Sequence, residues 1–151
     1  MKFSAFTDQQ LSSVSSMQRA AQQIKITAVE VMRCIQMELD RYPKDEQSGI
    51  LSALGDDRVS LKISTPFGEG RCRLELISDG HEVCGRYVVE KAYLSEADAT
   101  VWKAVWALRV SRREEVMLGD DGCWQDMYEA ADLLRRAAAS IIYAIAESTA
   151  A

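Results

Sequence analysis

The stretch RCRLELISDGHEVCGRYVVE, residues 71–90, decides which fold the sequence predicts. Apolar and polar residues alternate on both sides of the dipeptide Asp79-Gly80, and a period of two is typical of half-buried β-strands. An Asp-Gly pair between two such segments is the strongest short-range signal for a β-hairpin with a two-residue loop. We therefore expect two antiparallel strands that are joined at residues 79 and 80.

The register of this hairpin decides on which faces its two cysteines lie. A loop at residues 79 and 80 would place Cys72 opposite Tyr87 and Cys84 opposite Glu75. Because successive residues of a strand point to opposite faces, Cys72 and Cys84 should not be able to form a disulfide. The N-terminus has no secretory signal, so we expect reduced thiols at all four cysteines, which are Cys34, Cys72, Cys84 and Cys123.

A third strand is predicted before the hairpin, where Val59, Leu61 and Ile63 alternate with polar residues. Together the three segments predict an antiparallel β-meander over about residues 59–91. The preceding segment KDEQSGILSAL, residues 44–54, is expected to form one short helix that ends at Gly55.

A long helix is predicted over about residues 7–41. Thr7 and Gln10 have the spacing of a capping box, and Pro43 is expected to stop the helix at its other end. Apolar residues follow at alternating steps of three and four, which is the heptad pattern of packed helices. They are Val14, Met17, Ala21, Ile24, Ala28, Val31 and Ile35.

The length of this helix predicts an exposed end. About 34 helical residues span roughly 51 Å at 1.5 Å per residue. A compact chain of 151 residues has a diameter of roughly 38 Å if it is spherical. We therefore expect the N-terminal half of the helix to overhang the domain and to form a homodimer through part of the heptad pattern: Val14, Met17, Ala21, Ile24 and Ala28.

Two further helices are predicted after the meander, over about residues 96–118 and 122–147. Ser95 provides a start signal for the first helix, and Gly119 provides a C-terminal cap. The second helix would carry another heptad pattern, which consists of Met127, Ala131, Leu134, Ala138, Ile141 and Ile145. The expected fold is a single α+β domain of residues 1–151 with a long N-terminal helix, a three-stranded antiparallel meander and two C-terminal helices packed on one sheet face.

Length, charge and hydropathy restrict the classes of function. A chain of 151 residues with 48% hydrophobic residues is long enough to form one domain with its own core. Its net charge of -5 lacks the positive excess that direct nucleic-acid binding requires. The sequence has no apolar run of about 18 residues, so we expect no membrane span and a cytoplasmic location.

Residues for catalysis and metal binding are sparse in this sequence. The only histidine, His81, lies at the predicted hairpin loop, where an imidazole is more often a plain surface group than a catalyst. The cysteines have no C-x-x-C spacing, and the segment PFGEG, residues 66–70, is not followed by the lysine of a phosphate-binding loop. We therefore predict no catalytic residue, no metal ion and no cofactor.

The acidic stretch MLGDDGCWQDMYEAAD, residues 117–132, is the strongest candidate for a binding surface. Asp126, Glu129 and Asp132 are three residues apart, which would align them on one flank of the predicted helix beside Trp124. Helix capping is the simpler alternative, because acids are favoured at a helix N-terminus.

Arg112 and Arg113 come shortly before this stretch, and they are predicted either to be a solvated helix end or to contact a partner. The predicted docking surface therefore consists of Trp124, Asp126, Glu129, Asp132, Arg112 and Arg113.

These observations favour a non-enzymatic protein-binding module, a homodimer that acts as a stoichiometric inhibitor of a larger protein complex. Its acidic residues would bind a protein partner with a basic surface, such as the nucleic-acid channel of a nucleoprotein complex. Immunity proteins and phage anti-defence proteins such as anti-CRISPRs are similar in their small size and acidity, which is a likeness of class and not of motif.

Two alternatives stay open at this point. Class I type III secretion chaperones are also small, acidic, dimeric α+β proteins, but they have further strands between their last helices, which residues 110–118 would have to supply. The other alternative is a small enzyme or ligand-binding domain with a pocket between sheet and helices, lined by Tyr87, Trp102 and Cys72.

Overall fold

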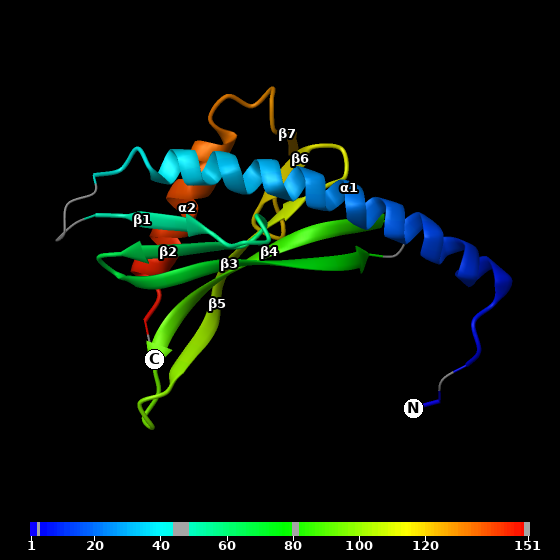
Figure 1. Ribbon diagram of the computed structural model, residues 1–151, viewed down its shortest axis with the longest axis horizontal. Helices are drawn as coiled ribbons and strands as arrows, with labels where there is room; N and C mark the ends of the chain where they lie inside the picture. The colour runs from blue at the N-terminus through cyan, green and yellow to red at the C-terminus, as the bar shows by residue number, and fades with distance from the viewer. Residues whose placement is uncertain (3, 44–48, 80–81, 150–151) are drawn as a thin grey trace.

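In chain order, a helix, seven antiparallel strands and a second helix follow one another in the computed structural model, which describes residues 1–2, 4–43, 49–79 and 82–149 (Figure 1). Helix α1 spans Asp8–Leu39, and helix α2 spans Leu133–Glu147. The strands are β1 (Leu51–Leu54), β2 (Leu61–Thr65), β3 (Gly68–Asp79), β4 (Glu82–Leu94), β5 (Thr100–Val110), β6 (Glu115–Leu118) and β7 (Trp124–Asp126). The α+β class and the long N-terminal helix are confirmed. The three-stranded meander and the two C-terminal helices are wrong.

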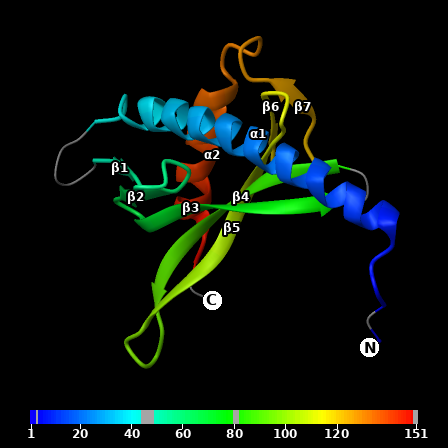
Figure 2. The ribbon, with the colours of Figure 1, turned by 45° about the vertical axis from the view of Figure 1, so that its right-hand side comes forward.

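The order of the strands in the sheet is the same as their order in the chain, so each strand pairs only with its neighbours in sequence. The sheet is strongly curled, and both helices lie on its concave side, where α2 crosses α1 (Figure 1, Figure 2). Helix α1 contacts α2 and strands β1, β4 and β5, and α2 also contacts β3, β4 and β5. The hydrophobic core therefore lies between the two helices and the concave face of the sheet.

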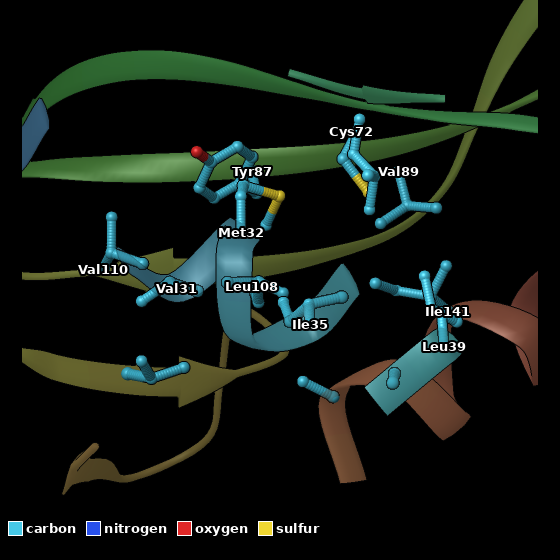
Figure 3. Close-up of a cluster of buried hydrophobic side chains, with 14 of the residues drawn as sticks. Val31, Met32, Ile35, Leu39, Cys72, Tyr87, Val89, Leu108, Val110 and Ile141 are labelled. Atoms are coloured by element: carbon cyan, nitrogen blue, oxygen red, sulfur yellow. The ribbon is translucent and has the colours of Figure 1, made fainter. Parts of the chain in front are cut away.

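Alternate side chains of the strands point into this core. In β2, Leu61 and Ile63 are buried, whereas Lys62 between them is exposed. Figure 3 shows Tyr87 of β4 beside Met32 of α1. Burial of each large apolar side chain stabilises the fold by about 1.5–3 kcal/mol. The largest fully buried side chains are Tyr87, Ile24, Met32, Ile35, Leu39, Leu61, Ile63, Leu108, Leu133, Ile141, Ile145 and Val31.

The N-terminal part of α1 extends beyond the sheet, as its length predicts (Figure 1). Residues 8–19 are all exposed, and Ala20 is the first helical residue that the core buries. The predicted capping box is present: the Gln10 N–H donates to the Thr7 side chain at 3.2 Å, and the Thr7 N–H donates to the Gln10 side chain at 2.8 Å. Local hydrogen bonds therefore stabilise an end of the helix that the core does not.

The hairpin of β3 and β4 has a different register from the predicted one. Leu74, and not Cys72, pairs with Tyr87, so the pairing is shifted by two residues. The shift arises because the strands stay paired up to Asp79 and Glu82. A shift of two residues leaves every side chain on its predicted face.

The predicted helix over residues 96–118 is wrong, because β5 and β6 occupy most of this range. The β5 segment TVWKAVWALRV is rich in the β-branched and aromatic residues that favour strands. Its helical appearance comes from a β-bulge. Val89 pairs with Trp106 and Glu90 pairs with Ala104, so Val105 is an extra residue that interrupts the alternation.

The bulge places Trp102 and Trp106 on opposite faces of the sheet. Trp106 packs against the core, whereas Trp102 lies on the outer face, with the Arg71 guanidinium 4.1 Å from its ring centroid. In a helix, the spacing of four residues would have put both indoles on one side.

Helix α2 begins at Leu133 and not at residue 122. Strand β7 comes first, and the Asp126 side chain then accepts hydrogen bonds from the backbone N–H groups of Tyr128 and Glu129 at 2.8 and 3.2 Å. Such side-chain bonds to the backbone compete with helix formation and favour a turn. The helix predicted over residues 122–147 is therefore correct only in its C-terminal part.

The short helix predicted over residues 44–54 is wrong in its last part. Residues 51–54 form β1, which pairs with β2, while residues 44–48 lie outside the described part of the chain. Gln36 of α1 also donates a side-chain hydrogen bond to the Ser52 carbonyl at 3.5 Å. These tertiary contacts outweigh the weak local preference of the segment.

Candidate functional site

The N-terminal part of α1 passes the end of the sheet (Figure 2). Side chains of the helix and of the sheet line a groove there. It has a volume of about 310 Å³, and its walls come from α1, the paired ends of β3 and β4, the turn between β5 and β6, and β7. Ligand pockets in proteins begin at about this size. The lining residues are Ser13, Ser16, Met17, Ala20, Ser78, Glu82, Val83, Cys84, Ser111, Arg112, Arg113, Glu115 and Trp124.

The α1 wall of the groove consists mainly of small side chains. Ser13, Ser16 and Ala20 are three and four residues apart, so they lie on the same side of the helix. Further along this side, Ile24 is fully buried in the core. Because serine and alanine fill less space than isoleucine, the groove stays open where the core ends.

Arg112 and Arg113 are presented at the groove by the tight turn between β5 and β6. The Ser111 hydroxyl accepts hydrogen bonds from the backbone N–H groups of Arg113 and Glu115, both at 3.1 Å. These bonds fix the backbone of the turn. Neither arginine forms an ion pair with any other residue that the structure describes.

The arginines on the outer face of the sheet differ because they are paired. Arg86 donates two hydrogen bonds to Asp120 at 2.9 and 2.7 Å, and Arg109 donates one to the same carboxylate at 3.1 Å. The bonds from Arg86, with those from Arg109, outweigh partial burial and hold the pKa of Asp120 well below its usual range. The sequence suggested only a helix cap for Asp120, since the two arginines lie 34 and 11 positions away.

Glu90 is a second carboxylate on the outer face that binds two arginines. It accepts hydrogen bonds from Arg71 and Arg73 at 2.9 and 3.2 Å. Burial favours the neutral acid, but the two guanidinium groups together have the larger effect, and the pKa of Glu90 is lowered. These four arginines of the outer face therefore form ion pairs with carboxylates of the same chain, unlike the two arginines at the groove.

Met17 and Trp124 supply the apolar part of the groove from α1 and β7. Their exposed fractions are 41% and 37%, so both side chains have surface available for contact. Methionine adapts its shape to irregular partners, and tryptophan is among the residues that contribute most to binding energy at interfaces.

Two carboxylates, Glu82 and Glu115, also line the groove. Glu115 accepts a hydrogen bond from the Ser111 hydroxyl at 3.4 Å, and Glu82 is exposed. The groove therefore combines apolar surface with charges of both signs, and it is not uniformly basic.

The structure brings together only part of the predicted docking surface. Arg112, Arg113 and Trp124 line the groove, although they come from different elements. Asp126 and Glu129 do not line it, nor does Asp132 at the start of α2. The predicted alignment of the three acids on a helix flank is wrong, since α2 begins only after them.

The three acids have local surroundings that fit neither a helix flank nor a helix cap, because Asp132 at the N-cap of α2 makes no side-chain capping hydrogen bond. Asp126 holds the turn after β7, and Asp132 forms an ion pair with Arg136 at 3.0 Å. Glu129 is exposed to solvent. Binding of a basic partner by these acids stays a prediction.

The residues predicted for dimerisation separate into two groups. Ile24 and Ala28 are fully buried against the chain's own sheet and α2, so they have no surface left for a second copy. Val14 and Met17 are exposed, and Ala21 is half-buried. The predicted homodimer is therefore restricted to the overhanging end of α1.

The predicted ligand pocket between sheet and helices is filled by side chains. Tyr87 and Cys72 are core residues with exposed fractions of 0% and 1% (Figure 3), and Trp102 lies on the other face of the sheet. The Tyr87 hydroxyl donates to the Ala28 carbonyl at 3.4 Å, which gives it a structural role. These three residues therefore do not line a common pocket.

None of the four cysteines forms a disulfide. Cys72 and Cys84 lie on opposite faces of their hairpin, as predicted. Burial raises the pKa of the Cys72 thiol to about 12, and burial followed by the charge of Glu30 raises the pKa of the Cys34 thiol. Both thiols are therefore poor nucleophiles near neutral pH.

Within the described residues, no three His, Cys, Asp or Glu side chains are grouped as a metal site. Gly80 and His81, which the sequence places at the hairpin loop, lie outside the described residues. Over the part of the chain that the structure describes, no helix has the length and apolar character needed to cross a membrane. No protein-family model, curated protein or solved structure matches the chain.

Proposed function

We propose that this chain is a protein-binding module that holds a short segment of a partner protein in the groove beneath α1. The proposal rests on the meeting of Met17, Trp124, Arg112 and Arg113 at one concave site from three separate parts of the chain. Tryptophan, methionine and arginine are enriched at protein interfaces, and concave sites with apolar walls and a few polar groups are the usual form of binding sites.

The surroundings of the groove favour a protein over a small molecule as its occupant. Leu11 and Val14 of the overhanging helix have exposed fractions of 55% and 47%. They lie on the same helix as Met17, so the apolar surface of α1 continues beyond the groove. A small ligand would leave this surface in water, whereas a protein partner would cover it.

The more specific expectations stay predictions within this proposal. They are inhibition of a larger complex, of the immunity or anti-CRISPR type, and a basic surface of the partner that would contact the acids outside the groove, which are Asp126, Glu129 and Asp132. For the chaperone alternative, strands are present in β5 to β7, but a single helix follows them, so they do not separate two C-terminal helices.

Site-specific photocrosslinking tests the proposal. A benzophenone amino acid is placed at Ser16, which lines the groove, or at Ser15, which is equally exposed but does not line it. Each variant is irradiated in an extract of the protein's own host, and adducts are identified by mass spectrometry. We expect a discrete protein adduct from position 16 and none from position 15. Equal adducts from both positions, or none from either, would refute the proposed groove.

A further inference from the structure

We infer that the groove takes an acidic segment of the partner, in which a carboxylate binds Arg112 and Arg113 and a neighbouring apolar side chain packs on Met17 and Trp124. This inference rests on the proposed function and adds the chemistry of the partner.

Arg112 and Arg113 bring two positive charges to the groove without ion-pair partners in the described part of the chain. Arg112 and Arg113 line it and have no carboxylate partner among the described residues, whereas Arg86 and Arg109 share Asp120 on the outer face. Arginine binds carboxylates through strong, charge-assisted hydrogen bonds, often in pairs. A carboxylate of the partner would give Arg112 and Arg113 the kind of ion pair that Arg86 and Arg109 already form with Asp120.

Two serine hydroxyl groups add further possible donors to the groove. Ser16 of α1 and Ser78 of β3 line the same groove as the two arginines. A serine hydroxyl can donate a hydrogen bond to a carboxylate oxygen that still has free lone pairs. The polar side of the groove is therefore suited to an anionic group.

The apolar residues of the groove indicate that the partner supplies an apolar side chain as well as a carboxylate. Met17 and Trp124 remain partly exposed although they line a concave site. A buried apolar anchor with adjacent charged contacts is the usual centre of a protein interface. The matching segment therefore has an acidic residue next to a large aliphatic or aromatic one.

A nucleic acid fits these observations less well than an acidic peptide. Phosphate backbones are bound by extended basic surfaces that neutralise many phosphates. This chain has a net charge of -5, and Glu82 and Glu115 line the groove together with the two arginines. Two arginines are enough for a carboxylate but provide little affinity for a polyanion.

A displayed library of random peptides tests the inference without knowledge of the partner. The library is selected on the immobilised full chain, and an enriched peptide is titrated by fluorescence anisotropy. We expect enriched peptides to carry Asp or Glu next to Leu, Phe or Trp. The double variant Arg112→Glu, Arg113→Glu should weaken binding by at least about tenfold, as expected for loss of charge-assisted bonds.

The chain offers a matched control in another adjacent pair of arginines. The double variant Arg135→Glu, Arg136→Glu makes the same change of charge on α2, away from the groove, and should change binding by less than about twofold. Circular dichroism checks that both variants fold. If the reversed charges prevent folding, the double glutamine variants replace them.

Three results would overturn the inference. They are enrichment of peptides without excess Asp or Glu, equal weakening by both double variants, and tighter arginine-dependent binding of a single-stranded oligonucleotide than of the peptides. If crosslinking at Ser16 succeeds while the enriched peptides are not acidic, the inference fails and the proposed function stands. If crosslinking also fails, both are wrong.

Discussion

Lys91 is a single residue that joins the sheet to the end of a helix. Its Nζ donates hydrogen bonds to the backbone carbonyls of Ile145 and Ser148 at 2.7 and 2.8 Å, and the residue is only 9% exposed. The last carbonyls of a helix lack intrahelical donors and carry partial negative charge. The ammonium group of β4 therefore caps the C-terminal end of α2.

Replacement of this lysine should destabilise the fold. Lys91→Met should lower the free energy of unfolding by about 1–3 kcal/mol, because buried carbonyls lose their donor. Urea denaturation followed by circular dichroism measures the change. Lys62→Met, at an exposed position of β2, should cost less than about 0.5 kcal/mol. Equal losses in the two variants would show that Lys91 has no special role.

The ion pairs of Asp120 should stabilise the folded state at neutral pH and lose this effect in acid. Its pKa is lowered in the folded state, so its contribution is present above the unfolded value of about 3.9 and is lost as the pH falls towards the folded value. The side chain is 45% exposed, and solvent screening limits the effect of Asp120→Asn at pH 7 to about 1 kcal/mol.

Urea denaturation over a series of pH values measures this dependence. The difference between the wild type and Asp120→Asn should shrink steadily below about pH 4. Asp121→Asn, which removes one negative charge at the neighbouring exposed position, serves as the control. A constant difference for Asp120→Asn at all pH values would argue against the ion pairs with Arg86 and Arg109.

At the level of elements, one heptad pattern in α1 lies in two environments. The capping box and the apolar spacing are local signals, so the sequence was sufficient to predict the helix. The pattern continues unchanged from Val14 to Ile24, and it does not show where the sheet ends. Only the structure shows that Val14 is exposed and that Ile24 is fully buried.

This division predicts unequal effects of two truncations on the same helix. Ile24→Ala should cost about 2–5 kcal/mol, as is usual for a fully buried aliphatic side chain. Val14→Ala should stay within about 0.5 kcal/mol at protein concentrations where the chain is monomeric. Thermal or urea unfolding of both variants gives the comparison. A large loss for Val14→Ala under these conditions would mean that the overhanging end is packed.

The strands show why sequence patterns succeed in one part of the sheet and fail in another. Apolar and polar residues alternate in β2 and in much of the β3–β4 hairpin, and all three strands were predicted. In β5 a single extra residue, Val105, changes the phase, and the resulting spacing of Trp102 and Trp106 imitates a helix. After β7, the hydrogen bonds of Asp126 produce a turn where acids near a helix start were expected.

The candidate site was predictable only as separate residues. Arg112, Arg113 and Trp124 were recognised as candidates because they are charged or large and aromatic. Their assembly into a groove with Met17 depends on how the overhanging helix passes the end of the sheet. This arrangement joins segments that are distant in sequence, and no local spacing encodes it.

For the whole molecule, the predicted homodimer is limited by the size of its remaining surface. Residues 8–19 of α1 are exposed and span about 18 Å at 1.5 Å per residue. A single helix contact of this length is short compared with the interfaces of stable dimers, which bury about 1,200–2,000 Å². A dimer through α1 alone should therefore dissociate readily.

Light scattering after size exclusion tests this state over a range of concentrations. We expect a mass that rises with concentration from 16.8 kDa towards twice that value. Val14→Glu should keep the chain at the lower mass, because a charge replaces apolar contact. A strict monomer at every concentration would eliminate the homodimer, and an undissociating dimer would place its interface elsewhere.

The identity of strand order and chain order has a consequence for how the protein folds. Every strand pairing closes a short loop, so the entropy lost in each closure is small and the sheet can grow in the direction of synthesis. Contact between α1 and α2 is different, because it joins segments from opposite ends of the chain. Until Ile141 and Ile145 are in place, the part of the apolar concave surface that α2 covers faces water. During synthesis, the nascent sheet is therefore most prone to aggregation just before its last helix emerges.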